Sequence, residues 1–213
     1  MAETQNAVPL RIGVLAMQGA FREHVRAVQA LGAEAVEVRR PEQLEGLDGL
    51  ILPGGESTAI GQLIQEFGLD PALRRFAKEG RPVYGTCAGM ILLAKDIADS
   101  QQYRLGLMDM RAQRNAFGRQ RESFEASVAV PALGEEPFPA VFIRAPYIES
   151  VQGPCEAMAV YGNKIVMARE GRFLATAFHP ELTDDLRVHR YFLDMARQAR
   201  EERALAKGQA SVL

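Results

Sequence analysis

The segment Pro82-Val-Tyr-Gly-Thr-Cys-Ala-Gly-Met-Ile-Leu-Leu93 joins two short apolar runs through a pair of glycines. Residues 82–85 are typical of a buried strand, and the run that begins at residue 88 is typical of a helix. Gly85 and Gly89 flank Cys87 in the pattern glycine–x–nucleophile–x–glycine, which permits a tight turn from a strand into a helix. Because such a turn lifts its central side chain out of the sheet, the segment predicts an α/β fold with Cys87 at a strand end.

Strands and helices alternate in the part of the chain that precedes this turn. Apolar runs predict buried strands at residues 11–16, 35–38 and 50–52. Apolar residues at helical spacing predict helices at residues 20–31, 58–67 and 71–78. This alternation is typical of βαβ units, which place parallel strands between two layers of helices. We therefore expect a flavodoxin-like, three-layer α/β fold with a mostly parallel central sheet.

The second half of the chain contains mostly short strand-like runs, which add further strands to this fold. The predicted strands are residues 107–112, 127–130, 141–144, 157–161, 164–168 and 173–178. Gly162-Asn163 and Glu170-Gly171 predict hairpin turns between the last three of these strands. Thr183 is expected to cap a final helix over residues 184–200, and residues 201–213 are expected to form a loose tail.

The composition is that of one folded domain. Hydrophobic residues make up 47% of the 213 positions, which is enough for a buried core. No repeat or low-complexity linker divides the chain, so we expect a single domain over residues 1–213, with its ordered core over about residues 10–200. The net charge of −2 gives no reason to expect nucleic acid or anionic lipid as a partner. The basic residues between positions 111 and 121 are read as a solvated face.

The sequence also bears on the location of the protein. No apolar stretch reaches the length of about 20 residues that spans a membrane, and the first ten residues lack the apolar segment of a secretory signal. The two cysteines, Cys87 and Cys155, do not form a disulfide framework or a CxxC metal pair. We therefore expect a reducing, cytoplasmic location, and we assign no role to Cys155.

Cys87 is the candidate nucleophile. The N-terminus of the following helix favours negative charge on its sulfur, and backbone N–H groups there point toward a developing oxyanion. The alternative is that Cys87 is a small buried apolar residue, which is the commonest role of a lone cysteine.

His179-Pro180-Glu181 follows the predicted strand 173–178 and precedes the final helix. A histidine at a strand end can reach a nucleophile above the same sheet edge, and Glu181 can hold the imidazole in the useful tautomer. The alternative is a structural histidine beside a carboxylate at a helix N-terminus. The other two histidines, His24 and His189, are read as ordinary residues on helix surfaces.

With these two motifs the sequence resembles the class I, or triad-type, glutamine amidotransferases, and within them the family of glutaminase subunits of pyridoxal 5′-phosphate synthase. The resemblance covers almost the whole chain, because matching segments occur at residues 15–20, 52–58, 85–91, 114–118 and 142–146. Many class I domains carry a glutamine after the turn, as G-x-C-x-G-x-Q, where this chain has Met90-Ile91. That departure agrees with the pyridoxal-phosphate branch.

The resemblance implies a mechanism. Cys87 attacks the side-chain carboxamide of glutamine, His179 takes the thiol proton and delivers one to the departing ammonia, and Glu181 orients His179. The γ-glutamyl thioester on Cys87 is then hydrolysed to glutamate. The mechanism needs no metal or organic cofactor, and pyridoxal 5′-phosphate is the product of the whole assembly.

The resemblance also implies a glutamine site. Positions that match contacts to glutamine are Gly55, Glu56, Ser57, Arg114, Ile143 and Arg144, and positions that match the oxyanion hole are Gly54, Gly55 and Ala88. An arginine suits the α-carboxylate of a free amino acid, because a guanidinium binds both oxygens. Taken alone, the glycines can be a simple turn and the arginines can be surface charges. Gln18-Gly19 ends the first strand, at the edge where open α/β sheets place their sites, so we expect it to border the site or a partner surface.

A glutaminase of this size has no room for an acceptor site, so its ammonia must serve another protein. The resemblance implies that a separate synthase protein, with the fold of a (β/α)₈ barrel, receives ammonia through an internal route and tends to activate the glutaminase on docking. Three alternatives stay open: the glutaminase of another pathway, such as histidine biosynthesis; a catalytically silent binding subunit; and a cysteine peptidase on a similar fold. Arg114 and the glycine loop at Gly54-Gly55 suit a free amino acid better than a peptide.

Overall fold

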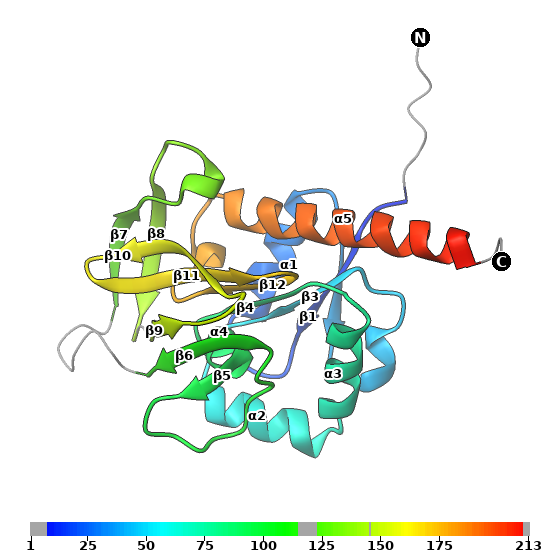
Figure 1. The fold of residues 1–213 in the computed structure, drawn as a ribbon, viewed down its shortest axis with the longest axis horizontal. Helices are drawn as coiled ribbons and strands as arrows, with labels where there is room; N and C mark the ends of the chain where they lie inside the picture. The colour runs from blue at the N-terminus through cyan, green and yellow to red at the C-terminus, as the bar shows by residue number, and fades with distance from the viewer. Residues whose placement is uncertain (1–7, 115–122, 145, 211–213) are drawn as a thin grey trace, which may run out of the picture.

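The computed structural model describes residues 8–114, 123–144 and 146–210, which form a ten-stranded sheet with helices packed on it and a separate two-stranded sheet at one end (Figure 1). The strands of the large sheet are β1 (Arg11–Leu15), β2 (Glu34–Val38), β3 (Gly49–Leu52), β4 (Val83–Thr86), β5 (Ala94–Ile97), β6 (Met108–Gln113), β9 (Tyr147–Val151), β10 (Glu156–Tyr161), β11 (Lys164–Glu170) and β12 (Phe173–Thr176). The small sheet pairs β7 (Ser123–Val128) with β8 (Phe138–Ile143). The helices are α1 (Phe21–Ala30), α2 (Ser57–Glu66), α3 (Asp70–Lys78), α4 (Ala88–Leu93) and α5 (Arg187–Ala210), with short 3₁₀ turns η1 (Pro41–Leu44), η2 (Pro131–Leu133) and η3 (Pro180–Leu182).

The parallel half of the large sheet positions the site. Its strands lie in the order β2-β1-β3-β4-β12, and each neighbouring pair is parallel. Every residue of β3 and β4 is buried, as expected for strands that are covered by helices on both faces. Leu52 lies opposite Gly85, and Thr86 lies opposite Thr176, so β3, β4 and β12 end nearly level at one edge. The α/β class and the predicted strands of the first half are therefore confirmed.

The second half of the sheet is mixed. β11 is antiparallel to β12, β10 and β9, and β9 is antiparallel to β6. The hairpins predicted at Gly162-Asn163 and Glu170-Gly171 are confirmed, because they join β10 to β11 and β11 to β12. β5 closes the sheet as a parallel neighbour of β6.

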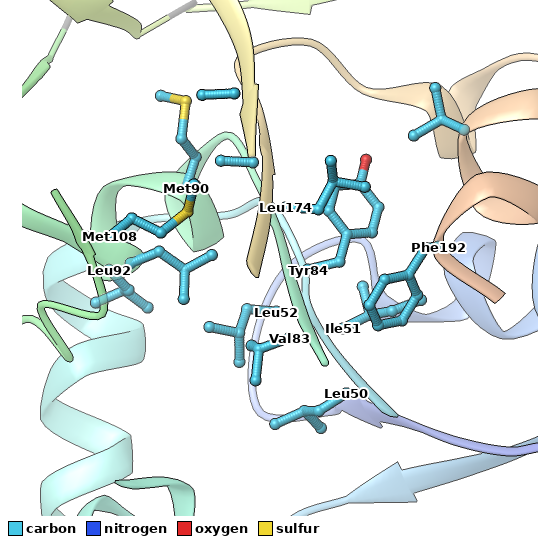
Figure 2. Packing of buried hydrophobic residues seen from close by; sticks show 14 of the residues in the cluster. Leu50, Ile51, Leu52, Val83, Tyr84, Met90, Leu92, Met108, Leu174 and Phe192 are labelled. Carbon is cyan, nitrogen blue, oxygen red and sulfur yellow. The ribbon is translucent and has the colours of Figure 1, made fainter. Parts of the chain in front are cut away.

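The core consists of two apolar layers, one on each face of the parallel strands. α1 and α5 lie on one side of these strands, and α2 and α3 lie on the other (Figure 1). Figure 2 shows Tyr84 and Phe192 packed on the side of α5, and Met90, Leu92 and Met108 on the opposite side. All five side chains are fully buried, and each contributes about 1.5–3 kcal/mol through burial. The two layers hold the strand ends in a fixed position.

The structure differs from the sequence-based expectation in several elements. β5 and β9 were not predicted, and the strand predicted at 127–130 is β7, which begins at Ser123. The last helix begins at Arg187 and continues to Ala210, so residues 201–210 are helical, and the prediction of a loose tail there is wrong. Thr183 does not cap this helix: its hydroxyl donates to the Pro180 carbonyl, and Asp185 accepts from the Arg187 N–H.

Some expectations fall on residues outside this description. They are the N-terminal residues 1–7, most of the segment 114–118 and of the basic group 111–121, Ala145 in the segment 142–146, and residues 211–213. Within the described ranges, no helix combines the length and apolar character that crossing a membrane requires.

Candidate active site

A cleft of about 790 Å³ opens at the carboxyl edge of the parallel strands. It collects segments that follow different strands, because β1, β3, β4 and β12 lie side by side there. Its lining residues are Gln18, Ala20, Gly54, Gly55, Glu56, Ser57, Cys87, Ala88, Ile91, Arg114, Ser123, Ile143, Arg144, Pro146, His179 and Leu182. Open α/β sheets bind their ligands at this edge.

Most residues predicted for the site line this cleft. Gly19 and Glu181 are the two predicted residues that do not: Gly19 packs behind the glycine loop, and Glu181 is buried behind His179. Five residues line the cleft without having been predicted as site residues: Ala20, Ile91, Ser123, Pro146 and Leu182.

The strand-to-helix turn at Cys87 is strained and closely packed. Cys87 has φ 51° and ψ −104°, an unfavourable conformation for a residue other than glycine, and its N–H donates to the Thr176 carbonyl at 2.8 Å. A Cβ on Gly85 would lie 2.4 Å from the Gly89 carbonyl oxygen, and one on Gly89 would lie 2.0 Å from the Leu52 oxygen. Both glycines are therefore required for α4 to pack against β3 and β4. This packing fixes Cys87 at the mouth of the sheet.

His179 and Glu181 form a buried pair beside Cys87. His179 Nδ1 lies 2.5 Å from Glu181 Oε1, and both side chains are at least nine-tenths buried. Burial alone would lower the pKa of His179. Hydrogen bonds and charge interactions with Cys87 and Glu181 outweigh burial and raise this pKa to about 10. Burial raises the pKa of Glu181, but His24 and His179 lower it more strongly. At neutral pH the pair is thus an imidazolium and a carboxylate.

The other two histidines are not on the surface, so that prediction is wrong. His24 and His189 have no exposed area, and their rings meet through His24 Nδ1 and His189 Nε2 at 2.8 Å. His24 Nε2 lies 3.0 Å from Thr86 Oγ1 and 3.5 Å from Glu181 Oε2. The helical periodicity contained the signal: His24 shares a face with Phe21 and Val28, but the polar side chain was read as solvent-exposed.

The loop after β3 packs directly on the residues that follow β1. Ala20 N–H donates to the Gly54 carbonyl at 3.2 Å, and Gln18 Oε1 accepts from the Glu56 N–H at 2.9 Å. A Cβ on Gly19 would lie 1.8 Å from the Gly54 oxygen, so this approach requires glycine. Because a peptide unit is planar and trans, the Gly55 N–H points away from α1.

Arg114 is held in the cleft near the residues that follow this loop. Its Nη1 donates to Gln102 Oε1 at 2.7 Å, and Gln102 Nε2 donates to Ser57 Oγ at 3.0 Å. Glu56 caps α2 by accepting from the Thr58 and Ala59 N–H groups, so its carboxylate is already occupied. Burial raises the pKa of Glu56, but these two backbone donors and Arg114 lower it overall.

Ile143 and Arg144 reach the cleft from the end of β8. Arg144 has φ 43°, which is strained for a residue with a side chain, and strain of this kind is common at functional sites. Gln102 was not predicted as a site residue, because nothing in its local sequence marks it and only the fold brings it to Arg114.

Two further observations concern residues that could hold a metal or form a disulfide. Across the described residues, no group of three or more His, Cys, Asp or Glu side chains could hold a metal ion. Cys155 is a buried free thiol whose pKa is raised to about 11 by burial and by the nearby acidic residues Glu170 and Asp109. It does not line the cleft.

A model of the SNO glutamine amidotransferase family matches residues 14–198. The chain belongs to the SNO glutamine amidotransferase family. The chain is 64% identical over 186 residues to a protein of Moorella thermoacetica named pyridoxal 5′-phosphate synthase subunit PdxT. That match covers 87% of this chain and 99% of the relative. A protein of the same name from Pelotomaculum thermopropionicum is 63% identical, over 87% of this chain and 94% of its own length.

Two solved structures share the fold of this chain. A crystal structure of a glutamine amidotransferase is 51% identical, with a TM-score of 0.83 over 87% of this chain and 98% of its own. The PurLQS structure from Thermotoga maritima has a TM-score of 0.63 at 15% identity, covering 87% of this chain and 98% of its own, a likeness of fold alone.

Proposed function

We propose that this chain is the glutaminase subunit of a pyridoxal 5′-phosphate synthase: it hydrolyses L-glutamine to L-glutamate and supplies the ammonia to a synthase partner. The observation that carries the proposal is the buried pair of His179 and Glu181 beside a strained Cys87, at the mouth of a cleft that also holds a guanidinium. Family membership and the names of the relatives support the same reaction and the same pathway.

The first half-reaction forms a thioester. The sulfur of Cys87 attacks the carboxamide carbon of glutamine after its proton has passed to His179 Nε2. His179 Nε2 then returns a proton to the amide nitrogen, the C–N bond breaks, and ammonia leaves. Glu181 keeps the other nitrogen, Nδ1, protonated and oriented through the contact at 2.5 Å. The high pKa of His179 fits its role as the acid that protonates the leaving nitrogen.

The second half-reaction releases glutamate. A water molecule gives a proton to His179, attacks the γ-glutamyl thioester and displaces the Cys87 sulfur. In both steps the carbonyl oxygen becomes negatively charged. We assign its stabilisation to two backbone N–H groups, that of Ala88 at the start of α4 and that of Gly55 in the Gly54-Gly55 loop. Ala88 starts α4 and Gly55 belongs to the loop after β3, so both groups lie on the same side of the cleft as Cys87.

We assign the binding of the amino-acid end of glutamine to the far side of the cleft. Arg114, already oriented by Gln102, suits the α-carboxylate, and Arg144 adds a second positive charge. Gly55, Ser57 and Ile143 complete the contacts. The carboxylate of Glu56 caps α2, so we assign to Glu56 a role in shaping the loop. Gln18 supports that loop through the Glu56 N–H.

The partner is the synthase protein, which we propose to be a (β/α)₈ barrel that receives ammonia along a protected route. Neither nucleic acid nor a membrane is part of this proposal, and the expected location remains the cytoplasm.

Glutamate release from glutamine by the purified chain tests the proposal, measured with and without the synthase barrel. A Cys87→Ala variant is the control. Release that the barrel stimulates and that is lost in the variant supports both the chemistry and the pathway. Release that ignores the barrel would point to another synthase, and no release from folded protein in a demonstrated complex would leave a silent binding subunit.

A further inference from the structure

A pair of histidines lies behind the proposed triad of Cys87, His179 and Glu181, on the side away from the cleft. His24 comes from α1 and His189 from α5, and neither lines the cleft. The contacts at His24 Nδ1 (2.8 Å to His189 Nε2) and at His24 Nε2 (3.5 Å to Glu181 Oε2) place its ring between His189 and the triad carboxylate. A continuous row of side chains therefore runs from Cys87 through His179, Glu181 and His24 to His189.

The proton positions in this row follow from which buried atoms have partners. Burial lowers the pKa of both His24 and His189, that of His189 to about 3, so each ring is neutral and carries one proton at neutral pH. A single proton lies between His24 Nδ1 and His189 Nε2. If His24 held it, His24 Nε2 would turn a lone pair toward the charged Glu181, and His189 would bury an N–H at Nδ1, an atom without a partner among the described residues.

The other arrangement satisfies more groups. If His189 Nε2 donates to His24 Nδ1, the proton of His24 lies on Nε2, where it faces Thr86 Oγ1 at 3.0 Å and Glu181 Oε2 at 3.5 Å. The atom left without a partner is then an acceptor, His189 Nδ1. An unpaired acceptor is more common in protein interiors than an unpaired N–H, and the carboxylate meets a donor in place of a lone pair.

We propose that His24, oriented by His189, is a positioning residue of this glutaminase: its Nε2–H holds the second oxygen of Glu181, so that the carboxylate stays charged and turned toward His179. The inference rests on the proposed function and adds a residue to it. Glu181 Oε2 is buried and has no hydrogen-bond partner among the described residues, so the ring of His24, whose Nε2 faces it at 3.5 Å, is the side chain placed to oppose its desolvation.

The other titratable groups around Glu181 do not take over this role. His179 is already engaged through Nδ1, and His189 reaches Glu181 only through His24. Burial and the charge of Glu181 raise the pKa of Tyr84, so it is neutral, and its hydroxyl lies 2.8 Å from Thr176 Oγ1. Glu23 acts on His24 by charge alone and raises its pKa slightly against the effect of burial.

A pair of substitutions separates the two nitrogens of His24. In His24→Asn the amide can replace Nδ1 and keep the contact to His189, but the donor to Glu181 is lost. In His24→Gln the longer amide can replace Nε2 and keep that donor. We expect His24→Asn to lower kcat for glutamate release about tenfold, because the buried carboxylate loses the N–H group that faces it, and to change KM by less than about twofold. His24→Gln keeps most of the wild-type kcat.

The pH profile distinguishes positioning from a merely structural role. If Glu181 holds its negative charge less strongly, it stabilises the His179 imidazolium less and the pKa of His179 falls. The alkaline limb of the kcat profile therefore moves to lower pH by about one unit in His24→Asn. A folded His24→Asn protein with the wild-type kcat and alkaline limb would overturn the proposal. So would equal losses in both variants with no movement of the limb. Wild-type protein that releases no glutamate would instead overturn the proposed function.

The proton positions can be read directly in the unaltered protein, which does not depend on whether a variant folds. The sequence contains three histidines, so tag-free protein with ¹⁵N-labelled histidine gives three ring signals in a long-range ¹⁵N–¹H correlation spectrum. We expect His24 and His189 to be neutral with the proton on Nε2, and His179 to be protonated at neutral pH. A His24 ring with its proton on Nδ1 would overturn the assignment.

Discussion

Replacing Gly54 by alanine places one methyl group against His179, the proposed catalytic histidine. The new Cβ would lie 2.4 Å from His179 Cε1, 3.1 Å from His179 Nδ1 and 3.5 Å from the Cβ of Cys87. Ordinary contact begins at 3.4 Å, so the imidazole must retreat by about 1 Å, and a misplacement of that size lowers a rate about 100-fold. Gly54 does not have a positive φ, so alanine fits its backbone and the effect arises from the contact with His179.

The assay is steady-state glutamate release in the presence of the synthase partner, with the unfolding midpoint measured on the same samples. We expect kcat for Gly54→Ala to fall about 100-fold while KM changes little, because the methyl group touches the triad and leaves the groups assigned to the α-carboxylate in place. Gly208→Ala is the matched control, since a Cβ there meets nothing within 4 Å. A Gly54→Ala protein with near wild-type kcat would refute the placement of His179 against this loop.

Three further predictions follow from charges and hydrogen bonds. Arg114→Ala raises KM for glutamine about 10- to 100-fold with a smaller change in kcat, whereas Arg114→Lys is intermediate; unchanged KM would contradict the assignment. The folded-state pKa of His189 is about 3 against 6.5 for a free histidine, so the stability it contributes is present above pH 6.5 and is lost as the pH falls toward 3. Urea unfolding at several pH values should therefore show a shallower acid loss in His189→Gln. Arg187→Ala removes hydrogen bonds to the Glu136 and Pro137 carbonyls, and lowers the free energy of unfolding by about 1–2 kcal/mol in the same assay.

The parallel half of the fold could be predicted because its strands have a recognisable pattern in the local sequence. Residues 11–16 and 50–52 are apolar runs that end at glycine or proline, and the structure has β1 and β3 there. β5 and β9 carry no comparable signal: Ala94–Ile97 is buried only at its two ends, and Tyr147–Val151 only at Ile148. These strands exist because β6 pairs with both of them, which is a tertiary effect that a single sequence does not display.

The end of the last helix was predicted too early, for a different reason. Residues 201–210 are almost entirely exposed, so no apolar stripe continues through them, and Gly208 suggested an end. The helix nevertheless extends to Ala210, because the stretch consists largely of alanine, glutamate, arginine and lysine, which favour helix without any packing.

For the site, the residues that belong to recognisable sequence motifs were predicted, and those brought there by packing alone were not. The turn at Cys87 and the pair of His179 and Glu181 lie where their motifs placed them. His24 was misread because its polar side chain was taken to be solvent-exposed, although it shares a helix face with Phe21 and Val28. Its contacts with Glu181 and His189 depend on α1, η3 and α5 meeting behind the sheet edge.

The most direct test of the central claim is to trap the covalent intermediate on Cys87. Wild-type protein in complex with the synthase barrel is mixed with glutamine, quenched in acid within the first turnovers, digested and analysed by mass spectrometry. We predict one γ-glutamyl group on the peptide that contains Cys87, none in Cys87→Ala, and an unchanged signal in Cys155→Ala. Glutamate release without any adduct on Cys87, or an adduct that persists in Cys87→Ala, would contradict the account.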